Sequence, residues 1–160
     1  MKLINATALA ATAAVIQIFD FQGQVVDLSQ GRTGDFVAIS AYEVLNNDNQ
    51  FWAVVAANNG LFQLINPTAN SIMSYASAPV LGTGGLILHQ QVMGHSVNDA
   101  NTTWFINATA NGSAMFIESS SGLALSSWPL NPQNSEVLVP LTLEEANGNP
   151  TQLFTIKPAA

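Results

Sequence analysis

The chain has 160 residues, 48% of them hydrophobic, which is enough apolar material for one packed core. Lysine and arginine total 3 against 10 aspartates and glutamates, so the basic surface that a nucleic-acid backbone requires is missing. The absence of cysteine excludes disulfides, thiolate metal sites and cysteine catalysis. We therefore expect a single domain over residues 1–160 that does not bind nucleic acid.

The N-terminal residues resemble a secretion signal only in part. One lysine, an apolar stretch and alanine-rich candidate cleavage points are present, but the polar run Asn-Ala-Thr interrupts the stretch. Cleavage near Ala14 would also cut just before a predicted strand. We expect an intact N-terminus and a cytoplasmic location, with secretion as the alternative. No apolar run reaches the roughly 20 residues of a membrane-spanning helix, so membrane insertion is not expected.

Short runs rich in β-branched and aromatic residues follow one another along the chain. Gly, Asn, Pro and Ser clusters separate them, and no capped amphipathic helix longer than two turns is visible. The pattern predicts an all-β protein. The predicted strands are 14–19, 24–28, 36–40, 52–56, 61–65, 86–90, 114–118, 137–141 and 153–157.

A large ring recurs at intervals of about 50 residues, at Trp52, Trp104 and Phe154. An Asn-Gly pair follows the first two rings at the same distance, at 59–60 and 111–112, and Asn-Gly favours a hairpin turn in which both residues have positive φ. The shared period predicts three repeats, approximately 14–56, 57–108 and 109–158.

Units of this size cannot each bury an apolar face alone, and closure around a pseudo-threefold axis removes their exposed edges. A β-trefoil meets these requirements. In it the strand at 14–19 would pair with the strand at 153–157, and the three rings would fill the floor of the barrel.

The chain resembles the ricin B-chain-like β-trefoil lectins, especially the cysteine-free, single-domain type of mushrooms. Their Gln-x-Trp motif is intact at 50–52, loses its Gln at 102–104 and loses its Trp at 152–154. The resemblance covers about residues 14–158 and is strongest over 23–52. It implies a carbohydrate-binding protein without catalysis or cofactor, a glycan ligand of the galactose or N-acetylgalactosamine type, and a role in fungal defence.

The resemblance also implies a shallow sugar site in the first repeat, formed by Asp27, Ser40, Tyr42 and Asn49. A carboxylate accepts two sugar hydroxyls in charge-assisted hydrogen bonds, and an amide supplies donors and an acceptor. A tyrosine ring stacks on the C–H face of a hexose. Each residue also has a structural interpretation: Asp27 as a turn residue, Tyr42 as packing, and Asn49 as an amide that ties down its loop.

The corresponding positions of the other repeats lack part of this set. Repeat two keeps an amide and a ring, and repeat three keeps neither the carboxylate nor the ring. We expect one principal site and a possible secondary site formed by Ser74, His89 and Asn101. The aligned residues of repeat three are Ser126, Pro140 and Thr151.

Other functions find less support. The spacing of His89 and His95 does not suit a helical metal pair, and Glu144 and Glu145 have no partner carboxylate at a readable distance, so neither a metal site nor a glycosidase is expected. The alternative function is a β-trefoil protease inhibitor that presents a loop at 66–71 or 128–136.

Glycosylation and assembly bear on the expected cellular role. N-glycosylation sequons stand at Asn5, Asn101, Asn107 and Asn111, and a glycan on Asn101 would obstruct the secondary site, which favours a chain outside the secretory route. If each chain has one weak sugar site, avidity requires either a homo-oligomer or a longer glycan that contacts additional surface.

Overall fold

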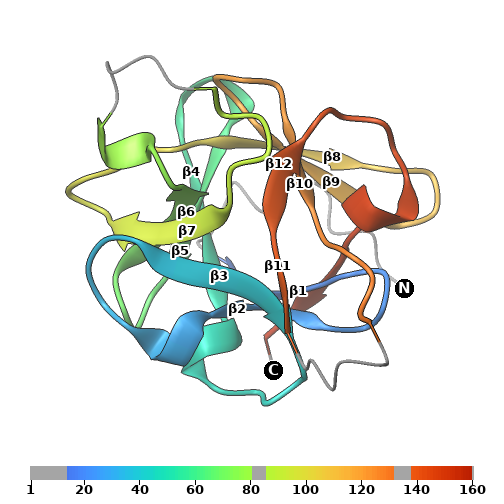
Figure 1. The fold of residues 1–160 in the computed structure, drawn as a ribbon, viewed down its shortest axis with the longest axis horizontal. Helices are drawn as coiled ribbons and strands as arrows, with labels where there is room; N and C mark the ends of the chain where they lie inside the picture. Colours follow the sequence, from blue (N-terminus) through green and yellow to red (C-terminus); the bar gives the residue numbers. More distant parts are fainter. Residues whose placement is uncertain (1–13, 81–85, 132–137, 160) are drawn as a thin grey trace.

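The computed structural model describes residues 14–80, 86–131 and 138–159 (Figure 1). The candidate signal at the N-terminus, the sequon at Asn5 and most of the loop 128–136 lie outside the described residues. None of the described helices is both long enough and apolar enough to cross a bilayer.

The described residues form β-strands linked by turns and three-residue 3-10 helices, which confirms the all-β prediction. The first six strands are β1 (Ala14–Phe19), β2 (Val25–Leu28), β3 (Val37–Tyr42), β4 (Trp52–Ala56), β5 (Phe62–Asn66) and β6 (Ser71–Tyr75). The later strands are β7 (Val92–Ser96), β8 (Trp104–Ala108), β9 (Ala114–Glu118), β10 (Ala124–Ser126), β11 (Leu138–Pro140), β12 (Thr142–Glu144) and β13 (Thr155–Pro158). The 3-10 helices are Ser29–Gly31, Asp48–Gln50, Asn58–Gly60, Ala78–Val80 and Pro150–Gln152.

Strand pairing closes part of the sheet into a ring. The ring runs β1, β2, β3, β7, β6, β5, β4 and back to β1. A branch of β8, β9, β10 and β12 leaves β5, while β11 pairs with β3 and β13 pairs with β1. Each strand of this ring therefore has a paired neighbour on both sides and offers no open edge to other molecules.

The predicted pairing of the first and last strands is confirmed. Ile16 lies opposite Pro158 and Phe19 opposite Thr155 in the antiparallel pair of β1 and β13. The ammonium of Lys157 lies 4.3 Å from the centroid of the Phe19 ring, an arrangement in which a cation is attracted to the aromatic face.

The three recurring rings are all fully buried in one core. The indole N–H of Trp52 donates to the carbonyl of Val26 at 3.1 Å, and that of Trp104 donates to the carbonyl of Met73 at 3.2 Å. Phe154 has no such donor and packs edge-to-face on Phe116. Buried indoles need a hydrogen-bond acceptor, whereas a phenyl ring does not.

The prediction of a strand at 86–90 is wrong. Leu88 and His89 form a turn closed by the N–H of Gln90 on the carbonyl of Ile87, and His89 has a φ of 69°. The apolar run suggested a strand, but a left-handed residue cannot continue one. The strand of this region is β7. The other strands that the sequence did not reveal are β6, β8, β10 and β12.

The two Asn-Gly turns differ. Asn59 and Gly60 have φ values of 61° and 74°, as the hairpin prediction required. In the loop between β8 and β9 only Gly112 has a positive φ, of 80°, and its N–H donates to the carbonyl of Thr109. A turn followed by one left-handed glycine is a second common hairpin connection, so the same dipeptide closes two different turns.

Candidate ligand-binding site

A hollow of about 300 Å³ opens between β2, β3 and the 3-10 helix Asp48–Gln50. We call it the β2–β3 hollow. All four residues predicted for the principal site line it, together with Leu45 and Leu138; the four are Asp27, Ser40, Tyr42 and Asn49. Strand geometry explains this meeting, because Asp27 pairs opposite Ser40 and residues two apart on a strand point to the same face.

Asp27 is the charged group of the β2–β3 hollow and is only 7% exposed. The side-chain amide of Gln50 donates to its Oδ2 at 2.9 Å. Among the described residues this is its only hydrogen-bond partner, so Oδ1 remains for a ligand. Burial raises the pKa of Asp27 above its ordinary value of 3.8, and the hydrogen bond from Gln50 opposes this shift.

Gln50 itself organises the loop that bounds the hollow. Its amide also donates to the carbonyl of Glu43 at 2.8 Å, and its oxygen accepts the N–H groups of Leu45 and Asn46 at 2.9 and 3.0 Å. Gln50 is fully buried, so each of these bonds satisfies a group that water does not reach. The Gln of the Gln-x-Trp motif therefore fixes both the loop and the carboxylate.

The remaining polar groups of the hollow have no partner in the described protein. Neither the hydroxyls of Ser40 and Tyr42 nor the side-chain amide of Asn49 makes a hydrogen bond within the described residues, and all three side chains are half-buried. Asn49 lies over Gly31, where φ is 59° and a Cβ would overlap its side-chain oxygen. The glycine thus allows the amide to sit against the backbone at the edge of the hollow.

Leu45 and Leu138 form an apolar rim that the sequence did not reveal. They are 47% and 48% exposed, and Leu138 lies opposite Tyr42 in the pair of β11 and β3. Leu138 belongs to the last third of the chain, and only the strand pairing brings it to this hollow. No local pattern could have assigned it.

The structure does not assemble the predicted secondary site. Ser74 is fully buried, and its hydroxyl is hydrogen-bonded to the hydroxyl of Thr102 at 2.5 Å. Thr102 stands at the motif position that Gln50 has in the first repeat. Asn101 lines a separate, shallow hollow of about 240 Å³ at residues 97–101. His89 lies elsewhere, against Glu144.

His95, rather than His89, occupies the place on β7 that Tyr42 has on β3. It is fully buried, accepts the N–H of Phe36 at Nδ1 at 3.0 Å, and bonds the carbonyl of Tyr75 through Nε2 at 2.8 Å. Donation to a carbonyl requires a proton on Nε2, and acceptance at Nδ1 makes the ring neutral. Both nitrogens are therefore committed to the protein, and the ring serves the core.

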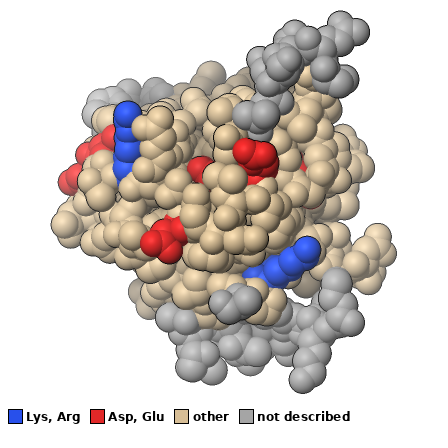
Figure 2. All heavy atoms as spheres, turned by 90° about the horizontal axis from the view of Figure 1, so that it is seen from below, with Lys and Arg blue, Asp and Glu red and all other residues tan. Residues whose placement is uncertain are grey.

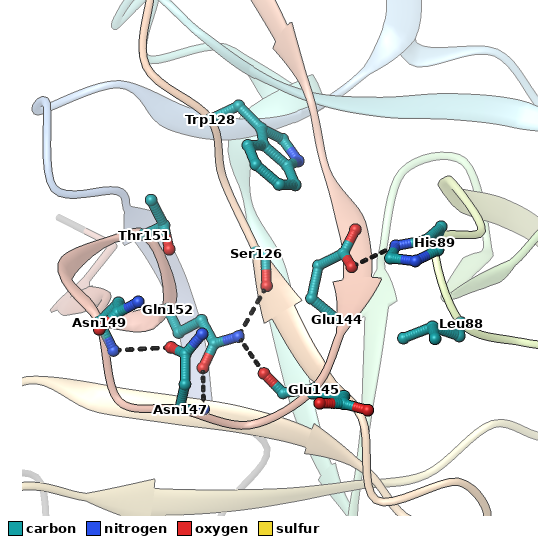
Figure 3. Close-up of a pocket in the computed structure, with 10 residues that line it drawn as sticks. All are labelled: Leu88, His89, Ser126, Trp128, Glu144, Glu145, Asn147, Asn149, Thr151 and Gln152. Carbon is teal, nitrogen blue, oxygen red and sulfur yellow. Dashed lines mark hydrogen bonds and ion pairs between the residues drawn. The ribbon is translucent and has the colours of Figure 1, made fainter.

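A larger hollow, of about 520 Å³, lies between β10, β12 and the turn that carries His89 (Figure 3). We call it the β10–β12 hollow. Gln152 donates to Ser126 Oγ at 3.1 Å and to the carbonyl of Glu145 at 2.8 Å. Its oxygen accepts the N–H groups of Asn147 and Gly148, so its four bonds match those of Gln50.

The register corrects the alignment of Pro140 with Tyr42. Ser126 pairs with Thr142, as Asp27 pairs with Ser40, so Glu144 holds the position of Tyr42. The different length of the connection between β10 and β12 produced the slip. Ser126 and Thr151 line the hollow as aligned, and this region does contain a carboxylate and a ring, in Glu144 and Trp128.

The surface in Figure 2 is mostly uncharged, with isolated basic and acidic side chains rather than a basic patch. Within the part of the chain that is described, no group of three His, Asp or Glu residues is placed to hold a metal ion. The candidate inhibitor loop at 66–71 is short and tied down, since Asn66 accepts the N–H of Ala69 and donates to the carbonyls of Asp48 and Phe51.

No family model and no curated protein matches the sequence. Solved structures do match in fold. An agglutinin of Rhizoctonia solani has a TM-score of 0.74 at 17% identity, covering 92% of this chain and 96% of its own. The Macrolepiota procera ricin B-like lectin, in complex with lactose, has a TM-score of 0.68 at 15% identity, covering 91% and 96%.

The designed threefold-symmetric protein ThreeFoil has a TM-score of 0.72 at 16% identity, covering 89% of this chain and 96% of its own. These structural neighbours are β-trefoil proteins. At such identities the likeness establishes the fold.

Proposed function

We propose that this chain is a non-catalytic carbohydrate-binding protein whose principal site is the β2–β3 hollow. Asp27 would accept sugar hydroxyls through its Oδ1, while Ser40 and Asn49 would exchange hydrogen bonds with neighbouring hydroxyls. The ring of Tyr42 would face the C–H groups of the hexose. A galactose-type sugar is the proposed ligand, because a carboxylate beside a ring suits vicinal hydroxyls above an apolar face.

The observation that carries this proposal is a set of polar groups that the described protein leaves unbonded around one hollow. Polar groups that are half-buried bond water or a ligand when the protein supplies no partner. Hydroxyls that both donate and accept can satisfy a carboxylate, a hydroxyl and an amide together, and a hexose carries several of them.

The affinity for a monosaccharide should be modest. The hollow is open and leaves part of a sugar in water, so we expect a Kd between about 10 μM and a few millimolar. The β-trefoil neighbours include proteins named as an agglutinin and a lectin, which supports a glycan as the ligand class. We also propose that the chain forms one domain of three units.

The test compares Asp27→Ser with the unchanged protein on a glycan array and by titration calorimetry with lactose. Serine is the residue that Gln152 bonds in the β10–β12 hollow, so the scaffold tolerates a hydroxyl at this place. We expect at least about tenfold weaker binding, since hydrogen bonds to charged groups contribute roughly 1.5–3 kcal/mol.

Asp48→Ser is the matched control, because it removes an exposed carboxylate from the 3-10 helix beside the hollow, at a residue that does not line the hollow. The control should bind as the unchanged chain does. Equal binding by Asp27→Ser, or no glycan bound by the unchanged chain, would refute the proposal.

A further inference from the structure

The β10–β12 hollow differs from the β2–β3 hollow in the side chains that face its opening (Figure 3). Trp128 projects over it, Glu144 lies below the indole, and His89 approaches from the turn before β7. The opposite side carries amides and a hydroxyl, from Asn147, Asn149 and Thr151. This hollow therefore combines an aromatic ring, a carboxylate and neutral hydrogen-bonding groups.

A chain of hydrogen bonds holds the ring and the carboxylate in place. Trp128 Nε1–H donates to Thr142 Oγ1 at 2.8 Å, and the Thr142 hydroxyl donates to Glu144 Oε1 at 2.9 Å. His89 Nδ1 lies 2.5 Å from Glu144 Oε2. Each carboxylate oxygen of Glu144 thus has one protein partner and can still accept a hydrogen bond from a ligand. The indole of Trp128 cannot rotate without losing its hydrogen bond to Thr142.

The charge of this hollow is negative. Glu144 has a side chain that is 15% exposed, and Glu145 is exposed beside it. Within the described residues no Lys or Arg lies within ion-pair distance of any carboxylate; the described pairs involve His only. The described ion-pair partner of Glu144 is the imidazole of His89, and no Lys or Arg of the described residues competes for this carboxylate. A carboxylate in a partly shielded hollow attracts an added cation more strongly than one in open water.

The aromatic face adds to this attraction. Trp128 is 42% exposed, and an ammonium group is attracted to the face of an indole more than to other rings. The chain already uses such a contact between Lys157 and Phe19. A ligand cation between Trp128 and Glu144 would meet both the ring and the carboxylate.

We propose that the β10–β12 hollow binds a saccharide unit that carries a free amine, such as a hexosamine without its acetyl group. The ammonium lies between Trp128 and Glu144, and the ring hydroxyls bond Asn149 and Thr151. This site is separate from the β2–β3 hollow and takes a ligand of different charge, so it goes beyond the proposed function and does not depend on it.

Intrinsic fluorescence offers a direct test, because Trp52 and Trp104 are fully buried and Trp128 is the exposed one of the chain's 3 tryptophans. Titration with glucosamine should change the emission with a Kd in the millimolar range, about −4 kcal/mol. N-acetylglucosamine, which is neutral, should bind at least about tenfold more weakly, and added salt should weaken glucosamine binding. Equal binding of the two sugars would overturn the proposal.

Variants separate this hollow from the other. Glu144→Gln keeps the size of the side chain and removes its charge, and it should weaken glucosamine binding about tenfold. Asp27→Asn, the same change in the β2–β3 hollow, should leave the fluorescence titration unchanged. An unchanged affinity in Glu144→Gln, or an equal loss in Asp27→Asn, would overturn the assignment.

Calorimetry with Trp128→Leu provides a second readout in case Glu144→Gln unfolds. The substitution leaves the charge intact and removes the ring, so the heat of glucosamine binding should fall several-fold. Undiminished heat would contradict the proposal. Lactose binding in the same variant reports on the β2–β3 hollow, so the two proposals fail separately.

Discussion

The β2–β3 and β10–β12 hollows share a scaffold but not a chemistry. Gln50 and Gln152 are both buried and make matching hydrogen bonds, two given by the amide and two accepted by the oxygen. Gln50 bonds a carboxylate, Asp27, whereas Gln152 bonds a hydroxyl, Ser126. The glutamine thus sets the loop, and its side-chain partner can change from acid to alcohol without altering the arrangement.

The largest expected effect is on stability, and it tests whether the two buried glutamines hold the loops of the hollows in place. Gln50→Ala or Gln152→Ala should each lower the free energy of unfolding by about 3 kcal/mol, because the loss of a buried side chain removes four hydrogen bonds, three of them to the backbone of its loop. Thr102→Ala, at the same place in the middle of the chain, should cost only about 1 kcal/mol, since it removes one hydrogen bond. Urea unfolding gives these values; a loss in Gln50→Ala no larger than in Thr102→Ala would argue against the scaffold role.

A second change makes the cores under the two hollows alike. Trp52→Phe copies Phe154, leaves the Val26 carbonyl without its indole partner and opens space in the core. We expect the free energy of unfolding to fall by about 1–2 kcal/mol. Thermal unfolding measures it, with Trp128→Phe as the exposed control, which should remain within about 0.5 kcal/mol. Equal losses of unfolding free energy in the two variants would show that the buried indole of Trp52 contributes no more to stability than the exposed indole of Trp128.

The third difference concerns pH, since Asp27 titrates and Ser126 does not. The pKa of Asp27 is raised by burial, so its ionisation opposes folding: its contribution to stability is greatest below its ordinary pKa of 3.8 and is lost as pH rises through the raised value. Glycan binding should show the opposite trend, because it needs the carboxylate and weakens as pH falls through that raised pKa. Titrations between pH 7 and pH 4 should show weakening that begins above 3.8.

The comparison variant for this experiment is Asp27→Ser. Any residual binding in it should lack the pH dependence, and its stability profile should differ from that of the unchanged chain in the same acidic range. A binding curve of the unchanged chain that stays flat from pH 7 down to pH 4 would mean that Asp27 does not contact the ligand.

The smallest expected effect comes from the apolar rim of the β2–β3 hollow. Leu138→Ser or Leu45→Ser should weaken glycan binding about two- to fivefold, since each removes a partly exposed apolar contact. The free energy of unfolding should change by less than about 0.5 kcal/mol. Leu86→Ser, which is exposed and outside the hollow, should change neither value. Calorimetry that separates the rim variants from this control would confirm that Leu138 belongs to the site.

The resemblance to the ricin B-chain-like lectins predicted the polar residues that line the β2–β3 hollow. Ser40 and Tyr42 share a face because strand residues alternate, and Asn49 adjoins the Gln that anchors the loop. Leu138 could not be predicted, because it reaches the hollow only through pairing between distant strands. His89 and Pro140 were aligned with Tyr42 wrongly, for different reasons. His89 adopts a left-handed turn within an apolar run, and the different length of the connection before β12 puts Glu144 rather than Pro140 at that position.

The pairing of β1 with β13 has a consequence for how the molecule is made. Residue 16 gains its neighbour on this side only after residue 158 has been synthesised. Until then one side of the first strand has no neighbour to bond, and such a strand can recruit a strand from another nascent polypeptide. Production should therefore be most vulnerable to aggregation while the last strand is still on the ribosome.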